Sequence, residues 1–447
     1  MSEKPALPRG PAALTAGFLA LMGTVFLLYT GPDGYAAIKQ AKLSAYFVLA
    51  GGYLVLMALY GLTALARGRA TLPTPAALWR KSSPAQKLVL CYWGFTALSA
   101  LCSPFGAQTI LGMTRGEGLV TQTLYCGTFL CVSAFAPPIR RLGGVTGAVM
   151  TAFCLLCLVQ MQGYNPLGLY PDGLSYLDAN INYAGIYLGT IGNADLVSAL
   201  LCLTLPLFAG LALRGTGRLR WLYLLPAALC ALVLVQMDVQ AGLVGAGLGL
   251  LLAAPKLLPL SQKGRKIAVF AVILLLLAGF AALLLVDAQS GTVYELQQVL
   301  RGNWQEDFGS GRVRIWRQVL ALVPQRPWLG FGPDTMSACG VTGYFWYHAA
   351  SDTTIPLMVD AAHNEYLNIL FHQGIPALLC YVGALLSTAA GWLRSRDGSA
   401  AALGAGVLCY GIQAFFGFSM CHTAGLFWLV WAALERINIL KREDNIL

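Results

Sequence analysis

The sequence predicts an all-α polytopic membrane protein with about twelve transmembrane helices. Of its 447 residues, 57% are hydrophobic and 11% are charged, whereas about 25% of the residues in a soluble domain are charged. Apolar stretches of about 18 residues, long enough to cross about 30 Å of hydrocarbon as a helix, recur along the chain. They are residues 12–30, 43–66, 86–102, 118–136, 142–160, 193–213, 219–236, 240–255, 267–286, 374–393, 400–419 and 422–440.

The first apolar stretch is expected to be a retained span. Lys4 and Arg9 precede it, as basic residues precede the apolar region of a signal peptide. No small-residue cleavage site follows, and apolar stretches continue to the end of the sequence.

The basic residues predict that both termini face the cytoplasm. With the N-terminus inside, 21 of the 29 lysines and arginines fall in inner segments, as the positive-inside rule requires. The net charge of +10 then reflects topology and contact with inner-leaflet lipids, so no nucleic-acid partner is expected. The predicted parts are 1–90 (helices 1–2 and a basic cytoplasmic loop), 91–286 (helices 3–9 with an outer loop at 161–192), 287–373 (a long extracytoplasmic loop) and 374–447 (helices 10–12 and a cytoplasmic tail).

The twelve cysteines do not predict a metal or redox site. Cys154 and Cys157 form a CxxC in the middle of an apolar stretch, but no second pair or nearby histidine completes a zinc site. Most of the cysteines lie inside spans and are expected to pack as small hydrophobic residues. We expect no metal and no cofactor.

The long outer loop is rich in arginine. Five of the eight basic residues expected outside lie there, and all are arginine: Arg301, Arg312, Arg314, Arg317 and Arg326. A guanidinium is permanently charged, and its planar fork suits phosphate or carboxylate oxygens. Because outer loops usually carry few basic residues, this positive charge indicates a functional role.

The segment after Gly311 predicts an amphipathic helix. Arg314 and Arg317 fall on one face, and the apolar stripe comprises Ile315, Trp316, Val319, Leu320 and Val323. The arginines would face either lipid headgroups or an anionic ligand, and the sequence leaves both open. Gly330 and Gly332 then predict a tight turn, since the third glycine and the preceding strand of a nucleotide-binding loop are missing.

Two histidines lie close to the start of a late apolar stretch. If residues 361–373 are helical, His363 and His372 point about 180° apart and cannot share a metal ion. A histidine where a helix enters the membrane from outside can accept a proton from a hydroxyl, since its unperturbed pKa is about 6.5. A purely structural role for His363 is the alternative.

These motifs together resemble a known family. His363-Asn364 is followed after nine residues by Gly374, and the preceding loop carries Arg312, Trp316 and the Gly-Phe-Gly turn at 330–332. This order resembles the O-antigen ligase and polymerase superfamily. The stretches 115–119 (RGEGL) and 192–207 (GNADLVSALLCLTLPL), and a plan of about twelve helices, also resemble it. The resemblance covers roughly residues 90–440.

The resemblance implies a GT-C-like glycosyltransferase of the bacterial cytoplasmic membrane with an outward-facing active site. The enzyme would transfer a glycan from a polyprenyl-pyrophosphate donor to a hydroxyl of a lipid or glycan acceptor, without a metal. Arg312 would bind the pyrophosphate and His363 would be the general base. The further substrate-binding candidates are Arg115, Arg314, Arg317, Asn364 and Gln240.

Two departures from the family pattern stand out. Ligases of this family carry an arginine, a second pyrophosphate ligand, where this chain has Gln240. The family's Gly-Asn-Pro-Asn reads Gly-Asn with Ala194 and Asp195 here. Arg115, Arg314 or Arg317 could supply the missing charge; otherwise the chain is a divergent member with a less charged donor, or an inactive one.

Two other functions remain as alternatives. A transporter or flippase with twelve helices would move its substrate without cleaving it, but few ionisable residues lie in the middle of the spans. Cell-wall polymerases related to peptidoglycan synthesis depend on a carboxylate in an outer loop, for which Asp334, Asp352 and Asp360 are available.

Overall fold

The structure is a computed structural model that describes residues 9–69, 71, 73–138, 140–170, 187–348 and 353–446. Half of the predicted outer loop at 161–192, residues 171–186, lies outside the described residues. The first half of the chain contains α1 (Arg9–Leu21), η1 (Met22–Phe26), η2 (Gly34–Ala36), α2 (Ile38–Tyr46), η3 (Phe47–Gly51), α3 (Gly52–Ala66), α4 (Pro75–Lys81), α5 (Pro84–Leu101), α6 (Gln108–Leu111), α7 (Leu119–Phe135), α8 (Arg140–Met161), β1 (Tyr187–Leu188), β2 (Gly192–Asn193) and α10 (Ala194–Arg214).

The second half is also mainly helical. It contains η4 (Arg218–Tyr223), α11 (Leu224–Met237), α12 (Gln240–Leu257), α13 (Gln262–Leu285), α14 (Gly291–Leu300), α15 (Arg312–Leu322), η5 (Val323–Gln325), η6 (Met336–Ala338), β3 (Thr342–His348), β4 (Thr353–Met358), α16 (Glu365–Arg394), α17 (Gly398–Gln413) and α18 (Cys421–Ile446). The strands pair as two small antiparallel sheets, β1 with β2 and β3 with β4.

The prediction of a helical membrane protein is confirmed in its coarse form. Among the described residues, eight helices are long and apolar enough to cross a membrane, and two shorter apolar helices span Gly10–Phe26 and Leu119–Phe135. Each of the twelve predicted stretches coincides with helical residues. The count of twelve crossings and their orientation stay predictions.

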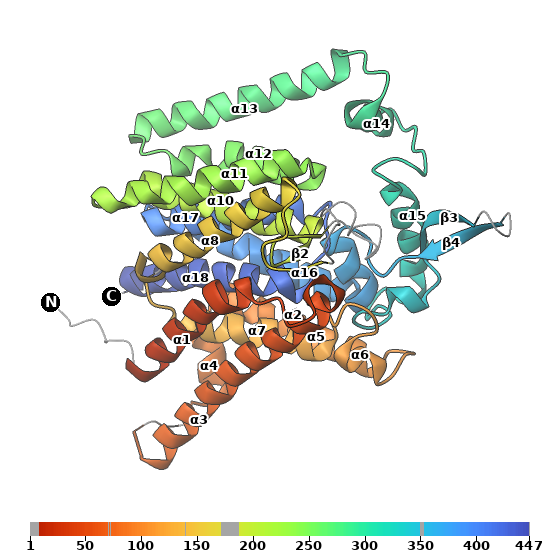
Figure 1. Cartoon of the computed structure of the whole chain (residues 1–447). Helices are drawn as coiled ribbons and strands as arrows, with labels where there is room; N and C mark the ends of the chain where they lie inside the picture. Colours follow the sequence, from red (N-terminus) through yellow and green to blue (C-terminus); the bar gives the residue numbers. More distant parts are fainter. Residues whose placement is uncertain are drawn as a thin grey trace.

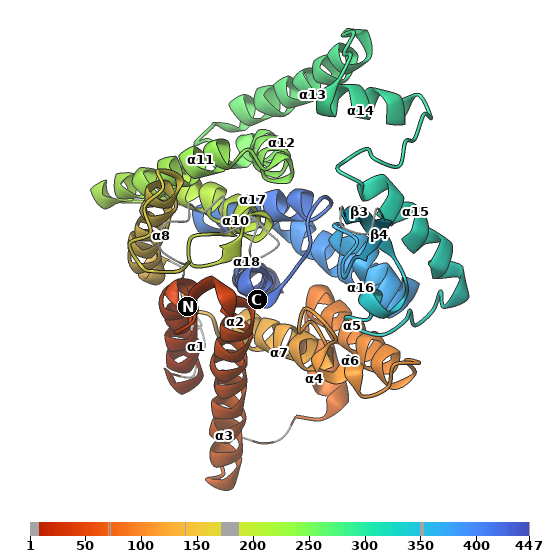
Figure 2. The ribbon, with the colours of Figure 1, turned by 45° about the vertical axis from the view of Figure 1, so that its right-hand side comes forward.

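The core of the bundle surrounds α10, which is buried along most of its length. α10 packs on α17, α11 and α12, while α18 packs on α7 and α16 packs on α5. By contrast, α13 stands away from the bundle and contacts mainly α12 and α14 (Figures 1 and 2). Because α13 is strongly apolar and almost wholly exposed, its surface suits lipid.

The two ends of the bundle differ in character. The start of α1 and the end of α18 lie at one end, at the left of Figure 1, whereas α15 and the β3–β4 hairpin project from the opposite end. α15 lies beside β3 and α16 (Figure 2). The turn before α7 is tied to the segment after α15 by hydrogen bonds from Thr114 and Arg115 to Asp334. The candidate site is therefore formed at the end away from the chain termini.

A break in α16 is held by the glycine turn at 330–332. Gly374 has φ 84° and ψ 177° inside the helix, which interrupts the helical hydrogen bonds there. Phe331 and Gly332 donate their N–H groups to the carbonyls of Phe371 and His372, at 3.0 and 2.9 Å. The predicted tight turn is thus present, and it supplies partners for backbone groups that the break leaves open.

Candidate functional site

His363 lies just before α16 and not within it. The prediction of a helix over 361–373 is wrong for its first residues, because the side chain of Asn364 caps the helix by accepting from Leu367 N–H at 3.0 Å. His363 has a left-handed backbone with φ 49°, which is uncommon outside glycine and concentrates at functional sites. Trp316 holds this segment by donating from Nε1 to the carbonyl of Ala362 at 2.8 Å.

Arg115 lies in the turn before α7, which Asp334 organises. The carboxylate of Asp334 accepts from the backbone N–H groups of Thr114 and Arg115, at 3.1 and 2.8 Å. The Arg115 guanidinium donates from Nη2 to Asp360 Oδ1 at 2.5 Å and lies 3.9 Å from the centre of the Phe418 ring. Its Nε and Nη1 are buried and have no hydrogen-bond partner among the described residues.

His363 and Arg115 both contact the ring of Phe418. The imidazole meets the Phe418 ring edge to face, with ring centres 5.2 Å apart. Burial, reinforced by the charges of Arg115 and Arg312, lowers the pKa of His363 from its ordinary value to about 3, although Asp360 opposes the shift. His363 is therefore neutral at pH 7, in the form that accepts a proton.

Asp195 lies across from His363 at the start of α10. Its Oδ2 atom is 3.9 Å from Nδ1 of His363, and burial acts on its carboxylate more strongly than the opposing charges of Arg312 and Arg115. Asn193 caps α10 by accepting from the backbone N–H of Asp195 at 2.9 Å. Four separate segments thus meet at one charged cluster.

Only one of the three arginines predicted on α15 joins this cluster. Arg312 acts electrostatically on His363, and its Nε is buried without a partner among the described residues. Arg314 instead pairs with Glu306 at 2.9 Å, and the exposed Arg317 donates to the carbonyl of Trp304. The predicted amphipathic helix is confirmed, as α15 begins at Arg312.

Asn364 and Gln240, two further substrate-binding candidates, form contacts within the protein that differ from those of the charged cluster. The Asn364 side chain serves as the helix cap described above, and only 3% of the residue is exposed. Gln240 is exposed at the start of α12 and donates to Asp238 at 3.1 Å. The first turn of α12 packs against α10 near Ser198, so Gln240 lies at the same end of the bundle as the cluster, with no described contact to it.

A small polar cavity of about 50 Å³ lies next to Arg115 and Asp360. Nε2 of His372 and Oε1 of Gln373 are buried there without partners among the described residues. The lining also includes Glu117, and burial raises the pKa of this carboxyl to about 8. A space of this size holds a few waters and no sugar.

A larger apolar groove of about 710 Å³ runs between α12, α16 and α17. Tyr366 and Phe415 line one end, and Trp392 lines the other. Phe415 also contacts Trp316, with ring centres 6.4 Å apart, so the groove adjoins the helix that carries Arg312.

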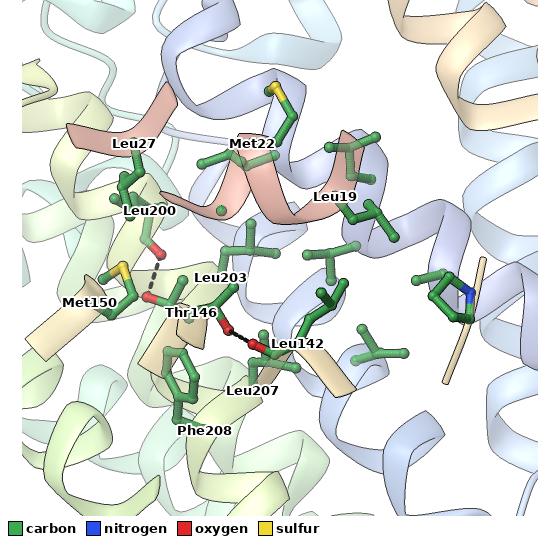
Figure 3. Close-up of a pocket in the computed structure, with 18 residues that line it drawn as sticks. Leu19, Met22, Leu27, Leu142, Thr146, Met150, Leu200, Leu203, Leu207 and Phe208 are labelled. Atoms are coloured by element: carbon green, nitrogen blue, oxygen red, sulfur yellow. Dashed lines mark hydrogen bonds between the residues drawn. The ribbon is translucent and has the colours of Figure 1, made fainter. Parts of the chain in front are cut away.

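A second apolar cavity, of about 120 Å³, lies among α1, η1, α8, α10 and α18 (Figure 3). Its hydroxyls are engaged within their own helices: Thr146 donates to Leu142 at 3.0 Å and Thr204 to Leu200 at 2.8 Å. This cavity has no group that could bind a charged substrate.

The carboxylates considered from the sequence are engaged in contacts within the protein where the structure describes them. No group of three or more histidine, cysteine, aspartate or glutamate side chains in that part of the chain could hold a metal ion. The carboxylate of Asp334 is engaged by backbone N–H groups, and that of Asp360 by Arg115. Asp352, the third carboxylate considered from the sequence, lies outside the described residues.

The sequence did not identify every member of the cluster. Asp195 was noted only as a departure from the family pattern, and Phe418 was not singled out. Both meet His363 through contacts between segments far apart in the chain, for which local spacing gives no signal. The unusual acidic residue opening an apolar span was the available clue.

Residues 225–382 match a family model described as O-antigen ligase. The match includes α15, the glycine turn and His363, but ends before Phe418 and begins after Arg115 and Asp195. It supports the O-antigen ligase and polymerase superfamily that the motifs indicate. No curated protein matches the chain.

Proposed function

We propose, from the match of residues 225–382 to a family model described as O-antigen ligase, that this membrane protein transfers a glycan from polyprenyl pyrophosphate to a hydroxyl acceptor. The family supports the coarser role of a surface polysaccharide ligase or polymerase. The donor, the general base and the outward orientation are the finer parts of the proposal.

The proposal rests on two partly buried arginines that carry buried, unpartnered donors near a neutral histidine. Arg115 Nε, Arg115 Nη1 and Arg312 Nε are buried donors without partners among the described residues. Burying such charged donors is costly unless an anion accepts from them. A pyrophosphate carries several anionic oxygens, enough to accept hydrogen bonds from two guanidinium groups.

The mechanism follows from these positions. Arg115 and Arg312 bind the pyrophosphate and stabilise the charge that develops on it as the bond to the anomeric carbon breaks. His363 accepts the proton of the acceptor hydroxyl while that oxygen attacks the same carbon. The two guanidinium groups supply the positive charge that other enzymes take from a divalent cation, so we expect transfer without a metal.

The apolar groove gives the lipid part of the donor a place. It lies along α16 and α17 and reaches Phe415, which packs against Trp316 four residues after Arg312. With the polyprenyl chain bound in this groove, the pyrophosphate at its end would reach the arginines. The chain itself would stay in an apolar environment.

The test is donor cleavage by purified protein in lipid nanodiscs. Polyprenyl-pyrophosphate-linked oligosaccharide is supplied with a lipid-linked core oligosaccharide, or with more donor as acceptor, in the presence of EDTA. We expect release of polyprenyl pyrophosphate by the native protein and its loss in His363→Ala. Movement of intact donor across vesicles without cleavage would instead support a flippase.

A further inference from the structure

The geometry points to Asp195 as the residue that positions His363 and stabilises its protonated form, an inference that rests on the function proposed above. A base that takes a proton on Nε2 must carry its other proton on Nδ1. A carboxylate that accepts from Nδ1 selects this tautomer and stabilises the imidazolium that forms. Asp195 is placed for this role.

The orientation of the ring supports the assignment. Nδ1 of His363 is buried and has no hydrogen-bond partner among the described residues, yet 17% of the side chain is exposed. The exposed part of the ring is therefore not Nδ1. Asp195 Oδ2 lies 3.9 Å from Nδ1, so a small rotation of either side chain would form the hydrogen bond.

The charged groups around His363 leave Asp195 as the available carboxylate. Arg115 approaches from the turn before α7, Arg312 from α15 and Asp360 from the segment just before His363. Asp360 is paired with Arg115. Within the described part of the chain, Asp195 is the only carboxylate within 4.0 Å of a His363 nitrogen.

The first turn of α10 fixes the position of Asp195. Asn193 accepts from the backbone N–H groups of Asp195 and Leu196, at 2.9 and 3.3 Å, which holds the first turn of the helix. A carboxylate at a helix N-terminus is stabilised by the helix dipole. The resembled family carries asparagine at this position, so a charged partner distinguishes this chain.

In the proposed reaction the proton of the acceptor hydroxyl passes to His363 and then to water. The acceptor O–H bond breaks and its proton forms a bond to Nε2 of His363, while the oxygen bonds to the anomeric carbon. The bond from that carbon to the pyrophosphate oxygen breaks, and the electron pair leaves with polyprenyl pyrophosphate. The imidazolium donates from Nδ1 to Asp195 throughout, and then releases the Nε2 proton to water.

The decisive kinetic measurement is kcat against pH at saturating donor for the native protein and Asp195→Asn. General-base catalysis contributes about 10²–10⁴-fold, so we expect kcat to fall at least tenfold in the variant. Loss of the carboxylate also disfavours the imidazolium, which lowers the pKa of His363 and moves the acid limb of kcat to lower pH. Asp195→Glu should retain the native limb, and the exposed Asp287→Asn should behave as native.

A second measurement is independent of turnover. The protein has four histidines, so ¹⁵N-histidine labelling with His363→Ala as the assignment standard gives the His363 tautomer. We expect a proton on Nδ1 in the native protein and a larger share of the Nε2–H tautomer in Asp195→Asn. A native His363 protonated on Nε2 overturns the inference even if the asparagine variant does not fold.

The two proposals fail in different ways. If His363→Ala retains transfer, the proposed general base is wrong and the role of Asp195 falls with it. If His363→Ala is inactive but Asp195→Asn keeps the native kcat, acid limb and tautomer, the positioning role alone is wrong. A lower kcat with an unmoved limb and tautomer indicates a merely structural role and also overturns it.

Discussion

At the scale of single residues, the site combines groups that are unfavourable without a ligand. Arg115 and Arg312 have buried donors without described partners, and His363 has a left-handed backbone. Such features cost free energy and persist where function uses them. The residues therefore mark the site more clearly than any cavity volume does.

Pyrophosphate binding should raise the pKa of His363. Burial, Arg115 and Arg312 lower it to about 3 in the free protein, and an anion at the guanidinium groups would cancel their repulsion of the imidazolium. We expect a rise of at least about one unit, measured by NMR titration of labelled His363 with and without inorganic pyrophosphate. An unchanged or lower pKa would contradict the placement of the anion.

Arg312 and Arg317 should differ strongly despite lying on one helix. Arg312→Ala removes a donor at the developing charge, which costs about 10²–10³-fold in comparable sites, so we expect kcat/KM to fall by about a hundredfold. Arg317→Ala removes an exposed contact to Trp304 and should change kcat/KM less than about threefold. Steady-state release of polyprenyl pyrophosphate measures both, and equal losses would refute the assignment.

Sequence reasoning singled out His363, Arg312 and Arg115 but did not predict their arrangement. The arginine-rich loop and the His-Asn pair are local patterns that a single sequence displays. The contacts of His363 with Asp195 and Phe418 join positions on different helices, which periodicity does not report. The side chain of Asn364 caps α16, and its predicted contact with substrate stays a prediction.

At the scale of elements, α15 was predictable and the hairpin was not. Gly311 in the left-handed region followed by an amphipathic stripe defines the start of α15. β3 and β4 have runs of aromatic and β-branched residues typical of strands, but the long loop was expected to carry helices. The glycine turn was foreseen, while its role in bridging the break of α16 depends on tertiary contacts.

The break at Gly374 should be intolerant of any side chain. Its φ of 84° is unfavourable for other residues, and a Cβ there would collide with the backbone of Trp328. Gly374→Ala should lower the free energy of unfolding by about 1–3 kcal/mol from backbone strain alone. Gly383→Ala, in the same helix, would meet only the two methyl groups of Leu88, at 3.4 and 3.8 Å. Thermal unfolding in detergent measures both variants, and an equal loss of stability in the two would contradict this view.

At the scale of the whole molecule, the orientation predicted from the basic residues assigns each end of the bundle to one side of the membrane. The start of α1 and the end of α18 lie at the end of the bundle opposite α15 (Figure 1). Most basic residues fall in segments that the sequence assigns to the side of the chain termini, which is the cytoplasmic side by the positive-inside rule. With this predicted orientation the arginines of α15 would be exceptions to that rule, and the proposed anionic substrate on the outer side would account for them.

This orientation predicts the behaviour of reporter fusions in a bacterial host. Alkaline phosphatase, which is active only after export, should be active when fused after Asn303 and inactive when fused after Leu260. A fluorescent protein that matures only in the cytoplasm should fluoresce when fused after Leu447. The reverse pattern would place His363 and the arginines on the cytoplasmic side, and the outward-facing transfer proposed here would then be wrong even if the purified protein cleaved the donor.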